Sequence, residues 1–158
     1  MANTQSMCTS FMGELMTATH NFGTAPIRAA TTADTFKAAL YLTTATVNAA
    51  TTAYSSTNEV TGTNYTAGGV AVTNATAPIA TNTSATAGVA YWTPSASITY
   101  TNVTLSTAFD AVLFYNSTQS NKAVSVHTFG SQTITAGTFT LTMPSNTTST
   151  ALLRLSTT

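Results

Sequence analysis

Chemistry in this chain has to come from few ionisable side chains, because its 158 residues include four Asp/Glu, four Lys/Arg and two His. A hydrolase of the Ser–His–acid type needs a nucleophile, a base and a group that orients the base. Ser and Thr are abundant, so the informative residues are the imidazoles His20 and His127. No Gly-x-Ser-x-Gly turn presents a serine, and we interpret His127 as a half-exposed strand residue. We therefore predict that the chain is not an enzyme.

Other chemistries lack a sequence pattern as well. Glycoside hydrolysis needs two carboxylates flanking one bond, but the acids are spread along the chain. A structural zinc site needs about four Cys/His ligands at close spacing, and we interpret Gly68-Gly69 as a turn rather than an anion-binding nest. We predict no catalytic residue, no cofactor and no metal site. The acids considered are Glu14, Asp34, Glu59 and Asp110.

Three other features have simple structural interpretations. The six Asn-x-Ser/Thr triplets arise by chance in a chain this rich in Asn and Thr. Cys8 is interpreted as a buried small hydrophobe, with a thiol that links subunits after release from the cell as the alternative. Tyr41, Trp92 and Tyr115 are interpreted as core or interface residues, with a carbohydrate-binding platform as the alternative.

One helix is expected ahead of a series of strands. Residues 9–22 place Phe11, Leu15 and Ala18 at helical spacing, and His20 to Gly23 followed by Pro26 indicate its end. Residues 34–43 alternate as a half-buried strand, and residues 44–69 are rich in turn residues. A short strand is expected at 70–73, followed by a surface loop over 74–88.

The second half of the chain reads as further strands. Strands are predicted at 89–92, 97–105, 109–116, 122–129, 138–143 and 150–156. The inward parity changes between Tyr100 and Val103, which indicates a β-bulge near Thr101 or Asn102. Residues 109–116 are apolar on both faces, which is typical of a central strand or of one whose outer face meets a partner. Val124 and Val126 point inward in 122–129, and in 138–143 the inward residues are Phe139, Leu141 and Met143.

These elements predict an all-β fold, a single β-sandwich or jelly-roll-like domain with a short N-terminal helix or arm. We expect an arm and helix over residues 1–33 and the sandwich over residues 34–158. The pattern does not separate jelly-roll from immunoglobulin-like topology.

The amino-acid composition argues against several classes of function. Charged residues make up 5% of the chain and the net charge is zero, against roughly 25% charged residues in an average domain. Four scattered basic residues argue against nucleic-acid binding, and no segment has the length of a membrane span. Thr supplies about a quarter of the residues, and such neutral surfaces suit packing against neighbours. The absence of a signal-peptide pattern predicts synthesis in the reducing cytoplasm.

Five blocks of sequence, in this order, resemble a family of small virion proteins of tailed bacteriophages. The blocks are CTSFMGELM (8–16), DTFKAALYL (34–42), TNEVTGTNYTAGG (57–69), AVLFYNS (111–117) and TALLRL (150–155). The resemblance implies a head decoration (cement) protein or a tail component, and no catalytic or ligand-binding residues are associated with it.

We therefore expect a structural virion protein, made in the cytoplasm of a bacterial host, that binds the outer surface of a phage capsid. It would stabilise the shell by adding contact area between subunits. The expected partners are the major capsid protein and further copies of the chain in a trimer or dimer. The alternative is a tail or fibre component that contacts the host surface or its glycans. The candidate interaction residues are Phe11, Met12, Leu15, Met16, Leu113 and Tyr115; the first four either reach a neighbour or cover one open end of the sandwich.

Overall fold

The computed structural model describes residues 3–8, 11, 15, 19–20, 22, 33–73, 77–81 and 88–156. The elements of this part of the chain are strands, which confirms the predicted all-β class. They form two antiparallel sheets, one of five strands and one of three. The strands are β1 (Ser6–Met7), β2 (Phe36–Leu42), β3 (Val70–Ala71), β4 (Ile79–Thr81), β5 (Val89–Trp92), β6 (Ile98–Asn116), β7 (Lys122–Leu141) and β8 (Leu153–Ser156).

The five-stranded sheet has the order β1-β7-β6-β2-β3. Its middle strand is β6, which pairs with β7 on one side and β2 on the other. Every residue from Ala111 to Asn116 is buried. This confirms the prediction that residues 109–116 form a central strand. The alternative, a strand whose outer face meets a partner, is not confirmed.

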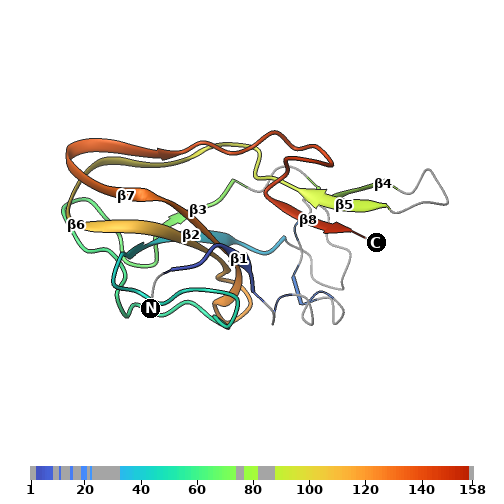
Figure 1. Cartoon of the computed structure of the whole chain (residues 1–158), viewed down its shortest axis with the longest axis horizontal. Coiled ribbons are helices and arrows are strands. Elements are labelled where there is room, and N and C mark those ends of the chain that lie inside the picture. Colours follow the sequence, from blue (N-terminus) through green and yellow to red (C-terminus); the bar gives the residue numbers. More distant parts are fainter. Residues whose placement is uncertain are drawn as a thin grey trace.

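A single long hairpin replaces four of the predicted strands. Residues 97–105 and 109–116 belong to one 19-residue strand, and residues 122–129 and 138–143 fall mostly in one 20-residue strand. Register shifts interrupt the β6–β7 pairing, and bulges of this kind bend a strand pair. Figure 1 shows the result: the far half of the hairpin turns back and runs above the main sheet. The predicted bulge near Asn102 is confirmed by a shift between Tyr100 and Val103 and by a φ of 56° at Asn102.

The inner side of the bent hairpin carries aromatic rings. The Phe109 and Phe139 centroids lie 5.1 Å apart, and those of Phe109 and Phe129 lie 5.9 Å apart. The Tyr100 hydroxyl donates a 2.8 Å hydrogen bond to the Ala38 carbonyl, which ties the far half of the hairpin to β2. Near the end of β7, the exposed residues Thr138 and Thr140 alternate with the half-buried residues Phe139 and Leu141, in agreement with the alternation predicted there.

The segment between β2 and β3 covers the other face of the main sheet, on its lower side in Figure 1. It forms isolated bridges from Glu59 to Tyr41 and from Thr63 to Thr104. Ala39 and Tyr41, on the face of β2 expected to be the more exposed one, are buried. The prediction of a half-buried strand here is therefore wrong, because this turn-rich segment packs back on the strand instead of extending into solvent.

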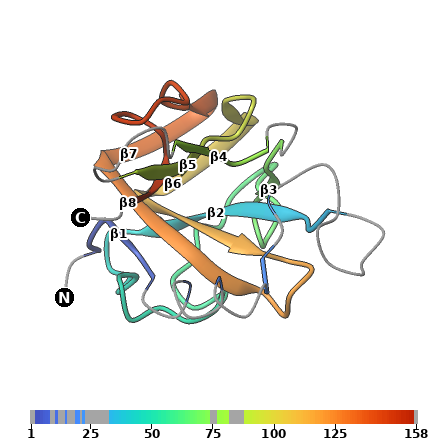
Figure 2. The same ribbon diagram turned by 90° about the vertical axis from the view of Figure 1, so that its right-hand side faces the viewer.

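The three-stranded sheet has the order β4-β5-β8, and Figure 2 looks onto the end of the molecule that carries it. The surface loop predicted over 74–88 is wrong for residues 79–81, which form β4 because they pair with β5. Residues 74–76 and 82–87 of that loop lie outside the described residues. The last strand begins at Leu153 rather than at residue 150.

The described part of the N-terminal segment packs against the main sheet. Two residues of β1 pair with Val126 and Ser125 of β7, and the Asn3 side chain accepts from the Val47 amide and donates to the Leu42 carbonyl. The structure gives no support to the helix predicted over 9–22, since most of those residues lie outside the described ranges. Cys8 is fully buried, which agrees with the buried-hydrophobe interpretation rather than with a subunit-linking thiol.

Candidate functional site

The six residues predicted to contact a partner fall into three groups. Phe11 is buried and Leu15 is half-buried, and both line one apolar hollow. Leu113 and Tyr115 are buried in the main sheet, so neither offers surface to a partner; the strand that carries them is covered on both faces. Met12 and Met16 lie outside the described residues.

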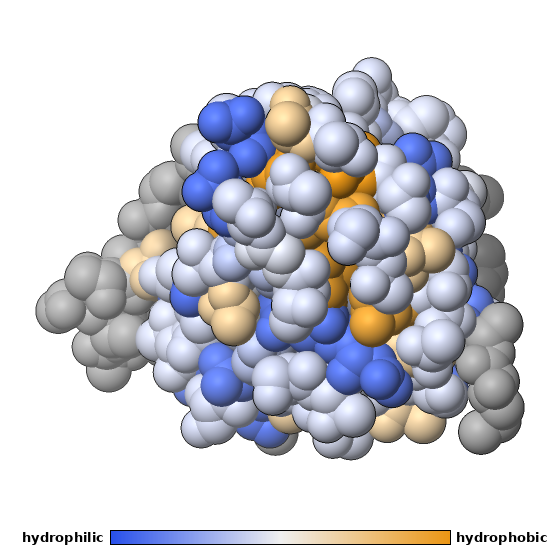
Figure 3. Space-filling model, turned by 90° about the vertical axis from the view of Figure 1, so that its left-hand side faces the viewer, coloured by the Kyte–Doolittle hydropathy of each residue, from blue (hydrophilic) through white to orange (hydrophobic). Residues whose placement is uncertain are grey.

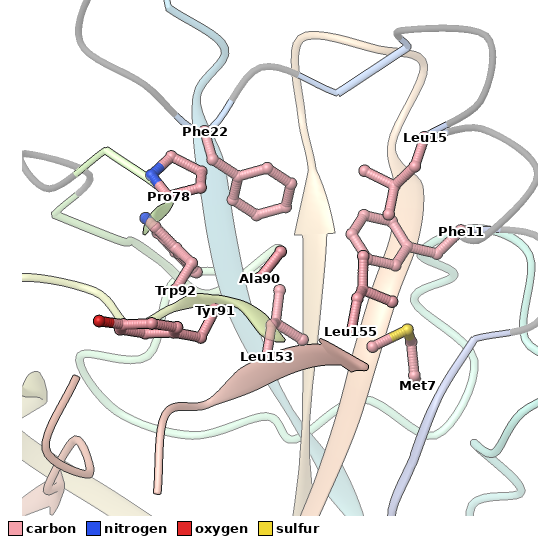
Figure 4. Close-up of a pocket in the computed structure, with 10 residues that line it drawn as sticks. All are labelled: Met7, Phe11, Leu15, Phe22, Pro78, Ala90, Tyr91, Trp92, Leu153 and Leu155. Atoms are coloured by element: carbon pink, nitrogen blue, oxygen red, sulfur yellow. The ribbon is translucent and has the colours of Figure 1, made fainter. Parts of the chain in front are cut away.

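The apolar hollow lies between the N-terminal segment and the three-stranded sheet, with a cavity volume of about 90 Å³. Figure 4 shows Phe11, Leu15 and Leu155 of β8 on one side of it, with Leu153 of β8 across from them. Phe22 and the β5 residues close the opposite side. The lining residues are Met7, Phe11, Leu15, Phe22, Pro78, Ala90, Tyr91, Trp92, Leu153 and Leu155.

Beneath this hollow, aromatic rings close one end of the core. Phe22 stacks on Phe36 at 4.5 Å and meets the edge of Trp92 at 4.8 Å. Phe11 lies 5.8 Å from Phe22, and such pairs contribute about 0.5–1.5 kcal/mol each beyond their buried area. Phe11 therefore packs against the aromatic rings at this end of the core.

The three-stranded sheet also carries the exposed apolar side chains. Among the described residues, Ile79 and Leu155 are the exposed large hydrophobics, at 43% and 39%. Arg154, beside Leu155, is exposed and donates a 3.4 Å hydrogen bond to the Thr148 carbonyl. This sheet thus combines apolar contact area with a positive charge. By contrast, Tyr41, Trp92 and Tyr115 are buried, so these three rings form no exposed platform for a carbohydrate.

A buried carboxylate organises the segment between β2 and β3, and the sequence reasoning missed it. Glu59 is 5% exposed. Its Oε2 accepts from the Tyr54 hydroxyl at 2.6 Å, and its Oε1 accepts from the Tyr65 hydroxyl at 2.8 Å and the Gly68 amide at 2.7 Å. The Tyr65 oxygen in turn accepts from the Leu40 amide. The signal that could have found this cluster is an acid, a tyrosine and a Gly-Gly pair within twelve residues.

This carboxylate and the burial around it affect the neighbouring tyrosines. Burial, strengthened by the negative charge of Glu59, raises the pKa of Tyr115 to about 12. Burial also raises the pKa of Tyr41 to about 12, although a hydrogen bond to the Ser55 carbonyl acts in the opposite direction. The pKa values of Tyr54, Tyr65 and Tyr100 are raised for the same main reason. These phenols stay protonated at neutral pH and can donate to Glu59 and to backbone carbonyls.

A second buried cluster joins the start of the main sheet to the β6–β7 turn. The Asn116 side-chain amide donates to Asp34 Oδ2 at 2.8 Å and lies 3.1 Å from His20 Nδ1. The Gln119 amide donates to Asp34 Oδ1 at 3.2 Å, and Asn116 Oδ1 accepts from the Thr118 and Gln119 backbone. The arrangement places a His, an Asn and an Asp together, but it serves to hold a turn and a strand end.

His127 lies on β7 beside Ser125, with 2.9 Å between its Nε2 and the Ser125 hydroxyl. Burial lowers the pKa of His127 to about 4, so the ring is neutral at physiological pH, and its edge contact with Phe114 has a centroid distance of 5.3 Å. Ser125 is 1% exposed. The Ser125 hydroxyl therefore presents little surface to solvent.

The described ranges hold no cluster of three His, Cys, Asp or Glu side chains that could bind a metal ion. Within the same ranges, no helix has the length and apolarity needed to cross a membrane. Comparison of the chain with protein-family models, curated proteins and solved structures finds no match.

Proposed function

We propose that this chain is a structural virion protein that binds the outer surface of a phage capsid and stabilises it through added contacts between subunits. The proposal starts from the resemblance of the five sequence blocks to small virion proteins of tailed phages. One of those blocks, residues 57–69, contains residues that build the fold, namely Glu59, Tyr65 and Gly68.

The observation that carries the proposal is that acidic side chains are hydrogen-bonded within the fold, which leaves a largely neutral surface. Asp34 and Glu59 are buried and hydrogen-bonded, and Asp110 accepts a hydrogen bond from Asn3. The exposed residues of the long hairpin are largely Thr and Ser, such as Thr99, Thr138 and Thr140. Figure 3 shows the end of the molecule at which the hairpin bends: most of it is pale, with a hydrophobic strip in the middle. Such a surface packs against neighbours without strong repulsion.

The contacts needed for this function are of ordinary size. A stable interface buries about 800 Å² on each partner, which is about a tenth of the accessible surface of 8029 Å². One such contact repeated over a shell adds stability at every site. A closed oligomer, a trimer or dimer, would match the symmetry axes of a capsid.

The test is the copy number of the chain in purified virions, measured by quantitative protein staining against the major capsid protein. A number comparable with that of the capsid protein supports a decoration protein. A handful of copies supports the alternative, a tail or fibre component that contacts the host surface. Absence from the particle would contradict both assignments.

A further inference from the structure

We propose that the outer face of the three-stranded sheet, the row Ile79, Tyr91 and Arg154, is the surface through which this chain contacts the capsid, and that the capsid presents a carboxylate beside apolar side chains there. The inference rests on the proposed function and names the site and the chemistry of the partner.

The strand register builds this row. Ile79 of β4 lies opposite Tyr91 of β5, and Tyr91 lies opposite Arg154 of β8. Because neighbouring residues of a strand point to opposite faces, these three side chains share one face of the sheet, and Leu153 and Leu155 share the other. Tyr91 is half-buried and also lines the hollow, so Ile79 and Arg154 are the exposed ends of the row. The hollow lined by Phe11 and Leu15 lies on the Leu155 side (Figure 4).

The row has the composition of an interface centre. Tyr and Arg are enriched among residues that dominate binding, and charged residues other than Arg are depleted there. Ile79 is the most exposed large hydrophobic of the described residues, at 43%. It also lies on β4, one of the two edge strands of its sheet, and edge strands without charges are places where another chain can add.

The charge of this face indicates which kind of partner it can bind. Arg154 is the one charged residue in the exposed class within the described part of the chain. The carboxylates of this part already accept hydrogen bonds: Asp34 from Asn116, Glu59 from the Gly68 amide, and Asp110 from Asn3. Asp34 and Glu59 are also buried and Asp110 is half-buried, so a second copy offers Arg154 no fully exposed carboxylate from these three residues. A different protein with its own carboxylate complements the row better, and an Arg–carboxylate pair fixes orientation as well as adding affinity.

The experiment uses capsids purified without this chain and measures co-sedimentation of the full chain and its variants. Ile79→Thr and Arg154→Glu change the outer face, and we expect each to weaken capsid binding by about tenfold or more. Two matched controls leave that face intact. Leu155→Thr removes the other exposed large hydrophobic, on the side of the same sheet that faces the apolar hollow. Lys37→Gln removes a positive charge from β2. We expect both variants to bind within about threefold of the parent chain. Unfolding midpoints of all four variants show that the fold is retained.

The outcomes separate this inference from the proposed function. If the parent chain binds and the Leu155 variant alone loses affinity, the side of the sheet at the apolar hollow is the contact surface. The inference is then wrong, while the proposed function stands. If Ile79→Thr leaves capsid binding intact but lowers the oligomeric state in sedimentation equilibrium, the outer face joins copies of this chain, which also overturns the inference. If the parent chain does not bind capsids at all, the proposed function fails first.

Discussion

The backbone amide of Gly68 donates a 2.7 Å hydrogen bond to Oε1 of Glu59, nine residues earlier in the chain. Two tyrosine hydroxyls, from Tyr54 and Tyr65, complete the shell of this buried carboxylate. The carboxylate thereby links the segment that covers the main sheet to the turn before β3. A charge in this position is stable only with such donors around it.

Replacing Glu59 with Gln tests the importance of this network. The Gln side chain has the same shape as that of Glu, but its NH2 group would face groups that are themselves hydrogen-bond donors. The charge-assisted hydrogen bonds to the carboxylate would also be lost. We expect the free energy of unfolding to fall by about 2–4 kcal/mol, measured by urea denaturation. Tyr54→Phe deletes a single donor and serves as the graded control, with an expected loss of about 1 kcal/mol. Equal stability of Glu59→Gln and the parent chain would contradict the structural role.

Gly69 provides a second test of the same turn. Its φ is +70°, and a Cβ added there would lie 1.7 Å from the Ala38 carbonyl oxygen. Gly69→Ala therefore forces β2 and the turn apart, and we expect a loss of about 3 kcal/mol or more in the free energy of unfolding. Gly130→Ala is the matched control, because its added Cβ meets no atom within 4 Å. If the two variants unfold at the same denaturant concentration, the close packing of this turn is not as described.

Acid should destabilise the protein through His127. Its pKa is lowered by burial from 6.5 to about 4, so the unfolded chain binds the proton at a higher pH than the folded chain. Stability contributed by the neutral ring is complete above about pH 6.5 and is lost progressively toward pH 4. The loss amounts to about 1–3 kcal/mol. We expect His127→Gln to show a smaller decline over this interval in urea unfolding. A parent chain and variant with parallel profiles would contradict this assignment.

The sequence predicted the class of fold because hydrophobic alternation is local information. It identified β2, β5 and the centre of β6, and it located the bulge at Asn102 from the change in parity between Tyr100 and Val103. It divided the long hairpin into separate strands because register shifts interrupt the alternation there. β4 escaped detection because Ile79 is one apolar residue in a stretch of Ala, Thr and Asn, and its strand exists through pairing with β5.

The candidate site was less predictable. Leu113 and Tyr115 were expected at an interface because an apolar strand in the core and an apolar strand at a contact look alike in sequence. Glu59 was counted as a lone acid, since its partners are defined only when the turn at Gly68 closes. The row of Ile79, Tyr91 and Arg154 depends on the register of three strands that are far apart along the chain, which residue spacing alone does not reveal.

Capsid binding should depend weakly on salt, because the contact surface proposed here contains one exposed charge, Arg154. Raising ionic strength from about 0.05 to about 0.3 M shortens the screening length and weakens exposed ion pairs. A single pair gives a change in affinity of a few-fold, whereas a surface held by many charges loses orders of magnitude. We expect co-sedimentation with capsids to change by no more than about fivefold over this range, and Arg154→Gln to remove most of that dependence. Lys37→Gln is the control of equal charge and should keep the dependence of the parent chain. A steep decline with salt in both variants would show that charges outside the described surface dominate binding.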